Sequence, residues 1–423
     1  MKTIQPQQTA GTTQPPTLAH VLVFLSLYVL SVGITIPTHP QLITQLYDGD
    51  VSSASSSFGK LISLSSALQF ILSPFFGAVS DIIGRKMTML IQVSLSCVYI
   101  GLLSVSSIKG SFTIALIAQV CNGLSGSVVQ TAMASIADLS TPEKRAQNFG
   151  LVGVAFGVGF CIGPMIGALL GNITLAFLIG TSLMVAATVY AVVFLRESLV
   201  KSPGQTVPPL LESANPVKSI RVLFYNRFTT YMSVLIIVIN LANQGFFGSA
   251  VHYNTYRFGF DAKQNGYYMT LLGLGTAIVQ GVLMKRLIPK LGEMFVLKAC
   301  YVIFIFFFVV MGYTDNGNVA FLMIVLFTVA GMSDPMQNGL MSKEIRKEDQ
   351  GSLQGGLSSL MLLSRVVASV TMSSLFSFFT SKSAPIQIPG IAYYVGAVLS
   401  VVALAIVLRL PEPSKQQQHK KDE

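Results

Sequence analysis

The sequence predicts an all-α membrane protein with twelve transmembrane helices, and two observations carry that prediction. The 423-residue chain is 52% hydrophobic and 10% charged, with a mean hydropathy of +0.65, whereas a soluble domain carries about 25% charged residues. It also contains twelve apolar runs of the length that a helix needs to cross a bilayer, about 20 residues. Because these runs are much longer than the ~10-residue strands of a membrane barrel, we interpret them as helices. They lie near 20–46, 57–79, 87–107, 111–137, 147–169, 172–195, 226–250, 264–284, 294–313, 318–341, 351–379 and 388–410.

The distribution of Lys and Arg predicts the orientation, since cytosolic loops of membrane proteins carry an excess of these residues. With both termini in the cytosol, five of the 27 Lys and Arg residues fall on the opposite side: Lys60, Lys109, Arg257, Lys263 and Lys382. The excess of Lys and Arg in the cytosolic segments thus explains the net charge of +10. We therefore expect the chain to contact a lipid bilayer and to bind no nucleic acid. The sequence does not distinguish the plasma membrane from an endomembrane.

The sequence lacks the residue patterns of enzymes and of cofactor sites. Its four cysteines fall within predicted helices, without disulfide or metal-site spacing. It contains no zinc-peptidase, phosphate-loop or dinucleotide fingerprint. We therefore expect a protein that is not an enzyme, that binds no metal or cofactor, and that does not use ATP bound to this chain.

Polar faces recur on every third predicted helix. The first run places Tyr28, Ser31, Thr35 and His39 on one helical face, because they are three or four residues apart. Buried amides and hydroxyls are costly in lipid unless they face protein or water. The recurrence favours a shared aqueous cavity, and interhelical hydrogen bonds are the alternative for any single residue. The faces of the fourth, seventh and tenth runs comprise Gln119, Asn122, Gly126 and Gln130; Asn240, Asn243, Gln244 and Phe247; and Asp334, Gln337 and Asn338.

Pro-rich residues 196–225 divide the apolar runs into two sets of six and predict a cytosolic linker. We expect bundles at 20–195 and 226–410, with disordered cytosolic tails at 1–19 and 411–423. The halves echo each other, as in many secondary transporters. Gly281–Gly292 is a degenerate copy of Gly77–Lys86 that has lost its acid.

The stretch Gly77-Ala-Val-Ser-Asp81-Ile-Ile-Gly84-Arg85-Lys86 is unusually charged for this chain. Its spacing Gly-x3-Asp-x2-Gly-Arg-Lys resembles the cytoplasmic loop signature of the major facilitator superfamily of transporters, and the resemblance covers about Leu18 to Leu410. It implies two pseudo-symmetric six-helix bundles that work by alternating access. It also implies that Asp81 approaches the start of the eleventh helix near Gly351 and that Arg85 meets Asp138, which would latch the halves in the outward-open state. The alternative is a positive-inside anchor without a gating role.

The fifth run carries glycines whose pattern resembles the antiporter motif of the drug/proton, tetracycline-resistance-like branch of that superfamily. The pattern comprises Gly153, Gly157, Gly163, Pro164 and Gly167. Gly153 and Gly157 form a GxxxG, which permits the close approach of a neighbouring helix. Glycine packing without a coupling role is an equally good interpretation.

Two features depart from the tetracycline-type exporters. Their first-helix acid corresponds to Tyr28, and the fourth-helix arginine of the family corresponds to Gln119. These departures put proton antiport by the usual N-terminal residues in doubt. An amide-rich first half also argues against a strongly cationic substrate.

Two ionisable residues lie deep in the predicted helices. Asp334 is roughly 13 Å from the cytosolic end and Arg365 roughly 21 Å, at ~1.5 Å of rise per residue. We predict an Asp334–Arg365 pair at the cavity wall that substrate or a proton breaks. The alternative is a static pair that sets helix register.

We expect a secondary active transporter for a small organic solute, acting as a monomer. The predicted cavity residues are Tyr28, Gln119, Asn122, Asn240, Asn243, Gln244, Asp334, Gln337, Asn338 and Arg365. Arg365 suits a carboxylate or phosphate on the solute. Proton-coupled export, symport and facilitated diffusion all stay open, as does a transporter-like receptor that moves no solute.

Overall fold

The computed structural model describes residues 18–140, 145–199, 223–345, 350–381 and 384–410. This part of the chain is helical and contains twelve helices or helix pairs long and apolar enough to cross a membrane. The predicted twelve-helix fold class is therefore confirmed. The predicted tails and most of the predicted linker lie outside the described residues, so the domain boundaries stay predictions.

The spans follow the predicted runs closely. Those of the first half are α1 (Leu18–Leu46), α2 (Val51–Ile83), α3 (Arg85–Lys109), α4 (Phe112–Leu124) with α5 (Val128–Asp138), α6 (Arg145–Leu169) and α7 (Ile173–Phe194). Those of the second half are α10 (Arg227–Phe258), α11 (Ala262–Ile278) with the π-helix η1 (Val279–Leu283) and α12 (Met284–Leu291), α13 (Glu293–Tyr313), α14 (Gly317–Ala330) with α15 (Ser333–Glu344), α16 (Gln350–Thr380) and α17 (Ile391–Leu408).

Three of the spans are interrupted, and the predicted runs give no sign of these interruptions. The fourth breaks between α4 and α5 at Gly126, whose φ of +64° is accessible to glycine at little cost. Ser127 then begins α5 by accepting a hydrogen bond from the N–H of Gln130. The other two interruptions are the π-helix before α12 and the turn between α14 and α15. Such breaks are tolerated in membranes where neighbouring protein satisfies the freed backbone groups.

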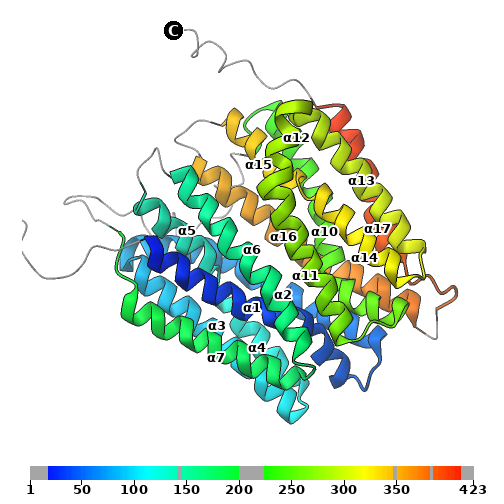
Figure 1. Ribbon diagram of the computed structural model, residues 1–423, viewed down its shortest axis with the longest axis horizontal. Helices are drawn as coiled ribbons and strands as arrows, with labels where there is room; N and C mark the ends of the chain where they lie inside the picture. Colours follow the sequence, from blue (N-terminus) through cyan, green and yellow to red (C-terminus); the bar gives the residue numbers. More distant parts are fainter. Residues whose placement is uncertain (1–17, 141–144, 200–222, 346–349, 382–383, 411–423) are drawn as a thin grey trace, which may run out of the picture.

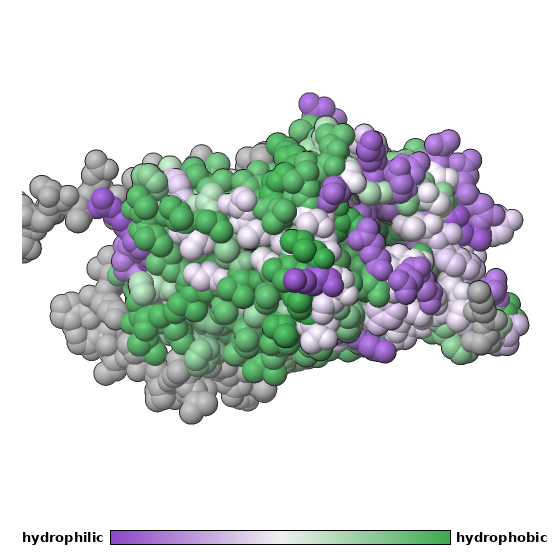
Figure 2. Space-filling view, turned by 90° about the horizontal axis from the view of Figure 1, so that it is seen from below, coloured by the Kyte–Doolittle hydropathy of each residue, from purple (hydrophilic) through white to green (hydrophobic). Residues whose placement is uncertain are grey.

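The core divides into two clusters of buried apolar side chains. One draws its buried members from residues 21–195 and the other from residues 223–407. In Figure 1 the first half lies at lower left and the second at upper right. Apolar side chains also cover much of the outer surface, as the green area of Figure 2 shows. Helices satisfy their backbone hydrogen bonds internally, and an apolar exterior suits lipid, so this surface fits a bilayer.

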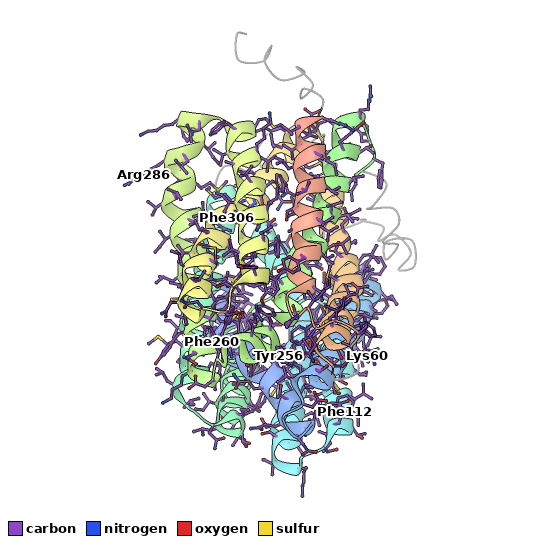
Figure 3. The ribbon with its side chains drawn as sticks, turned by 90° about the vertical axis from the view of Figure 1, so that its right-hand side faces the viewer. Lys60, Phe112, Tyr256, Phe260, Arg286 and Phe306 are labelled. Atoms are coloured by element: carbon purple, nitrogen blue, oxygen red, sulfur yellow. The ribbon has the colours of Figure 1, made fainter. Side chains whose placement is uncertain are left out.

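The two ends of the molecule differ in how the halves meet. We call the end with Gly77–Lys86 and α12 the motif end and the end with Asp50, Gly171 and Gly259 the far end. At the motif end the halves diverge, with α5 at the left and α12 at the top of Figure 1, and Arg286 of α12 projects from the molecule in Figure 3.

At the far end the halves are in contact. There α2 packs along α16, and α6 along α11. Ser52 donates to the Ser377 carbonyl at 2.7 Å, and Ser63, nearer the middle of the same helix, donates to the Val366 carbonyl at 2.9 Å. The described arrangement is therefore closed at the far end.

Candidate functional site

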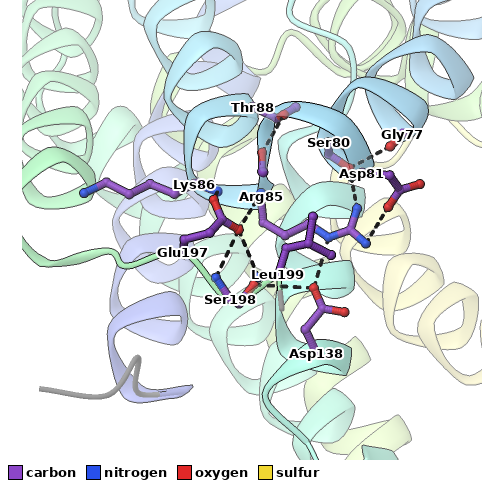
Figure 4. A network of polar contacts seen from close by, with 11 residues as sticks. Gly77, Ser80, Asp81, Arg85, Lys86, Thr88, Asp138, Glu197, Ser198 and Leu199 are labelled. Carbon is purple, nitrogen blue, oxygen red and sulfur yellow. Dashed lines mark hydrogen bonds and ion pairs between the residues drawn. The ribbon is translucent and has the colours of Figure 1, made fainter. Parts of the chain in front are cut away.

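The charged stretch at the motif end forms a network around the Arg85 guanidinium (Figure 4). The Arg85 side chain is 12% exposed, and its Nη2 lies 2.7 Å from Asp81 Oδ1. Its Nε donates to Asp138 Oδ2 at 3.0 Å, and its Nη1 donates to Ser80 Oγ. Arg85 and Asp138 thus meet as the family resemblance implies, and they tie the end of α5 to the start of α3.

Glu197, just after α7, holds the backbone at the start of α3. Its carboxylate accepts hydrogen bonds from the N–H groups of Arg85 at 2.8 Å and Lys86 at 3.2 Å. These N–H groups have no partner within the helix, and the helix dipole favours a negative charge beside them. Gly84 has a φ of +102°, and a Cβ there would collide with the Glu197 carboxylate. Sequence reasoning missed Glu197, because no motif links an acid after the sixth run to the loop after the second.

The other predicted gating residues are less constrained. The Asp81 side chain is 53% exposed, and its ion pair with Arg85 lies within its own half. Lys86 donates to the Val192 carbonyl at 3.0 Å, and a Cβ at Gly77 would meet open space. The side chains at the start of α16, residues 350–352, lie outside those that the structure describes, so the predicted approach of Asp81 to Gly351 stays a prediction.

The predicted helix-five motif divides into a packed part and an open part. A Cβ at Gly163 would lie 2.7 Å from the Gly33 backbone, and one at Gly167 2.5 Å from the Ile34 carbonyl oxygen. Pro164 lies between them, where α6 packs on α1. A Cβ at Gly157 would make an ordinary 3.6 Å contact with Ala277, and one at Gly153 would meet nothing. The close approach that the GxxxG permits is therefore not used at Gly153 or Gly157 in this arrangement, whereas a Cβ at Gly159 would lie 2.5 Å from the Val29 side chain of α1. A coupling role of the motif stays a prediction.

Predicted cavity residues of the first half lie at different depths in the packing. Gln119 is fully buried and donates to Ser65 Oγ of α2 at 3.3 Å, which is the interhelical alternative that its sequence pattern left open. Gln119 Oε1 has no hydrogen-bond partner. Tyr28 and Asn122 are half-buried. The backbone carbonyl of Asn122 accepts a hydrogen bond from Gln69 of α2.

The predicted cavity residues of the second half also differ in burial: some are packed against neighbouring helices and others are exposed. Gln337 is buried and donates to the Tyr301 hydroxyl of α13 at 2.9 Å. Asn240 donates to the Ile236 carbonyl of its own helix. Asn243 is buried, and its Oδ1 has no hydrogen-bond partner. Asn338 is exposed, although it lies on the polar face of the tenth span.

The predicted Asp334–Arg365 ion pair is not formed. Arg365 Nε instead donates to Gln244 Oε1 of α10 at 3.1 Å, so a neutral amide takes the place that we predicted for the carboxylate. Asp334 is exposed, and among the described residues it has no ion-pair partner. Arg365, bound to the Gln244 amide, and the separate carboxyl group of Asp334 are thus two distinct ionisable groups.

The comparisons with known proteins agree with this geometry. A family model described as Major Facilitator Superfamily matches residues 20–369. The chain belongs to this superfamily. As a major facilitator protein it is a non-enzymatic transporter that carries small molecules within a membrane, as predicted.

Similar proteins include tetracycline resistance proteins and several solved transporter structures. The class C tetracycline resistance protein of Escherichia coli is 25% identical over 92% of this chain and 96% of its own length. The hippocampus abundant transcript 1 protein of Homo sapiens is 22% identical over 94% and 85%. A crystal structure of the human organic anion transporter MFSD10 (TETRAN) has a TM-score of 0.69, 22% identity and coverage of 93% and 100%. A D-xylose-proton symporter has a TM-score of 0.70, 14% identity and coverage of 94% and 98%. The predicted resemblance to the tetracycline-resistance branch is thereby confirmed.

Proposed function

We propose that this major facilitator protein is a secondary transporter that moves a small organic anion by alternating access. The observation that carries the proposal is the position of Arg365, half-buried in the middle of α16. Its hydrogen-bond partner is the neutral Gln244, and its charge is balanced by no ion pair among the described residues. A charged side chain inside a membrane is costly and marks a substrate or ion pathway. A carboxylate or phosphate group on a substrate would pair with the Arg365 guanidinium through charge-assisted hydrogen bonds.

The motif end is the cytosolic end in this proposal, with both chain termini on that side. The positive-inside distribution of Lys and Arg supports this orientation. Closure of the far end then corresponds to a state open toward the cytosol. The Arg85 network would support the opposite, outward-open state, in which Asp81 contacts the second half.

Asp334 is the residue that would couple transport to protons. It is an exposed carboxylate on the polar face of the tenth span, apart from Arg365. Intramembrane carboxylates recur in proton relays of transporters. Proton-coupled export is the coupling that we propose, and facilitated diffusion is its rival. One relative is named a tetracycline resistance protein and one neighbour an organic anion transporter, and the proposed substrate class rests on Arg365 alone.

Transport into proteoliposomes tests the proposal. The panel would contain carboxylates, organophosphates, and neutral and cationic solutes, with and without a pH gradient. Arg365→Gln should reduce anion transport roughly tenfold to a hundredfold, since a hydrogen bond to a charged group contributes about 1.5–3 kcal/mol. Arg257→Gln is the matched control, because Arg257 pairs with Asp315 at the far end.

Each outcome identifies a function. Loss of the pH-gradient effect in Asp334→Asn, with anion flux retained, supports proton coupling. Anion flux that ignores the gradient in the unmodified protein indicates a facilitator. Preference for neutral or cationic solutes overturns the substrate class. No flux for any solute, in protein that is folded and inserted, indicates a transporter-like receptor.

A further inference from the structure

Two histidines from opposite halves enclose a phenylalanine at the far end. His39 of α1 lies edge-on to Phe58 of α2, with ring centroids 5.1 Å apart. His252 of α10 lies against the same Phe58 ring at 5.3 Å. The histidines are 5% and 1% exposed. Each lies about two turns before the end of the first helix of its half, since a turn holds about 3.6 residues. The two halves thus contribute matching imidazoles to one buried cluster.

This His–Phe–His cluster lies within the contact that closes the far end. One residue after Phe58, a Cβ at Gly59 would collide with the backbone of Ser369 and lie 2.5 Å from the Ser373 side chain. The His252 ring also reaches the backbone of Pro40 in α1. Opening the far end must therefore separate His252 from Phe58 and His39.

Among the described residues, the cluster contains no acidic partner for a positive charge. His39 Nε2 and both ring nitrogens of His252 lack a hydrogen bond of normal geometry. His39 Nδ1 has a long 3.4 Å contact with the Tyr99 hydroxyl of α3. Among the described residues, no carboxylate forms an ion pair with either imidazole.

The charged groups nearby face other ways. Lys60 of α2 lines a separate pocket with Tyr47 and Phe112, and Figure 3 shows Lys60 and Phe112 away from Phe260. Asp261 accepts the N–H of Gln264 at the start of α11. The sequences of α7 and of residues 366–380 in α16 carry no charged side chain.

A vestibule connects the cluster with the far-end surface. It has a volume of about 500 Å³, and His252 and Asp261 are among its lining residues, together with Gln41 and Gln45 of α1. His252 is therefore the member of the cluster that lines the vestibule, and its ring nitrogens are buried while the halves are closed.

We propose that this His–Phe–His cluster is a proton-binding gate, which stays closed when both imidazoles are neutral and opens the far end when they are protonated. An imidazolium buried without an acid loses its hydration, and opening returns it to water. Acid on the far side therefore holds the transporter open toward that side. The gate is independent of the identity of the solute and of Asp334.

Distance measurements between spin labels test the gate without any transport assay. Lys109→Cys in the first half and Ile386→Cys in the second place labels on the far end, in full-length protein whose four native cysteines are replaced. In lipid nanodiscs the open population should grow as the pH falls below about 6.5, where imidazole in water becomes charged. Two protons taken up on opening would change the open-to-closed ratio up to about a hundredfold per pH unit.

Variants separate the gate from other titrating groups. His39→Gln or His252→Gln alone should reduce the response to about tenfold per pH unit, and the double variant should abolish it. His20→Gln is the matched control, since His20 contacts Tyr190 and Phe194 within the first half, and it should keep the full response. A flat response in the unmodified protein overturns the proposal, as does an unchanged response in either single variant. The single variants decide the question even if the double variant does not fold.

Discussion

The two halves carry the same ion pair at the motif end with its charges reversed. In the first half, Arg85 at the start of α3 pairs with Asp138 at the end of α5 at 3.0 Å. In the second half, Glu293 at the start of α13 pairs with Lys343 near the end of α15 at 2.7 Å. Each pair follows a glycine of positive φ, +102° at Gly84 and +80° at Gly292. The geometry of the turn is thus common to both halves, and the signs of the charges are not.

The helix dipole explains what the reversal requires. A helix N-terminus favours negative charge, so Glu293 suits the start of α13 directly. Arg85 places a positive charge at the same position of α3, and there Glu197 supplies the negative charge by accepting two backbone N–H groups. The Glu197 carboxylate therefore offsets the unfavourable positive charge of Arg85 at the helix start. Arg85 can then occupy this position and bind both Asp81 and Asp138.

Burial separates the two pairs further. The side chains of Arg85 and Asp138 are 12% and 25% exposed, whereas those of Lys343 and Glu293 are 58% and 35% exposed. Exposed pairs are weak because water competes for both charges. We infer that the first-half network is a rigid element of the fold and that the second-half pair is a marginal one.

The largest expected effect comes from replacing Arg85 with an acid, the residue type that the second half carries at the matching position, Glu293. Arg85→Glu would place an acid beside Asp81 and Asp138 and against the Glu197 carboxylate. We expect a loss of about 2–4 kcal/mol, near the range for breaking a buried pair, seen as a lower melting temperature in detergent.

Restoring the pairing tests the role of Glu197. Arg85→Glu with Asp138→Lys reproduces the order of the second half and should recover part of the stability. Adding Glu197→Gln should recover more, because the new acid then satisfies the helix start alone. Full recovery while Glu197 is unchanged would contradict this account of the reversal.

An intermediate effect is expected for Glu197→Ala alone. This change removes the cap of α3 and leaves Arg85 opposed to the helix dipole, which should cost about 1–2 kcal/mol. Glu197→Gln keeps an acceptor for the N–H groups and should cost less. Thermal unfolding of the two variants measures the difference, and equal losses would mean that the charge contributes more than the hydrogen bonds.

Most of the fold could be predicted from the sequence, because the length of an apolar run and the excess of Lys and Arg are local signals. The twelve runs and the division into two halves follow from them. The interruptions could not be predicted in the same way. Gly126 and the π-helix after Ile278 lie inside the predicted runs 111–137 and 264–284, and the packing of neighbouring helices, which the length of a run does not contain, selects those backbone angles.

Contacts of the candidate site could be predicted where a sequence motif links the residues. They could not be predicted where only tertiary packing brings the residues together. The spacing around Arg85 leads to Asp138 through the family resemblance. Glu197 joins the same network from a distant part of the sequence that no spacing connects with it. The predicted Asp334–Arg365 pair is absent from this arrangement for a related reason: helical rise gives the depth of each residue but not the direction it faces, and Arg365 donates to Gln244 instead. That substrate or a proton forms and breaks the pair stays a prediction.

The smallest effect is expected for Lys343→Gln, which breaks the exposed pair of the second half. Because both side chains are accessible to water, the loss should be below about 1 kcal/mol. It should also fade with added salt, since the screening length falls from about 10 Å at 0.1 M to about 3 Å at 1 M. Arg85→Gln, measured beside it, should keep most of its effect in 1 M salt because the Arg85 side chain is largely shielded from solvent. If the two variants lost the same stability and responded alike to salt, burial would not be what distinguishes the halves, and the motif-end pairs would be equivalent in spite of their reversed charges.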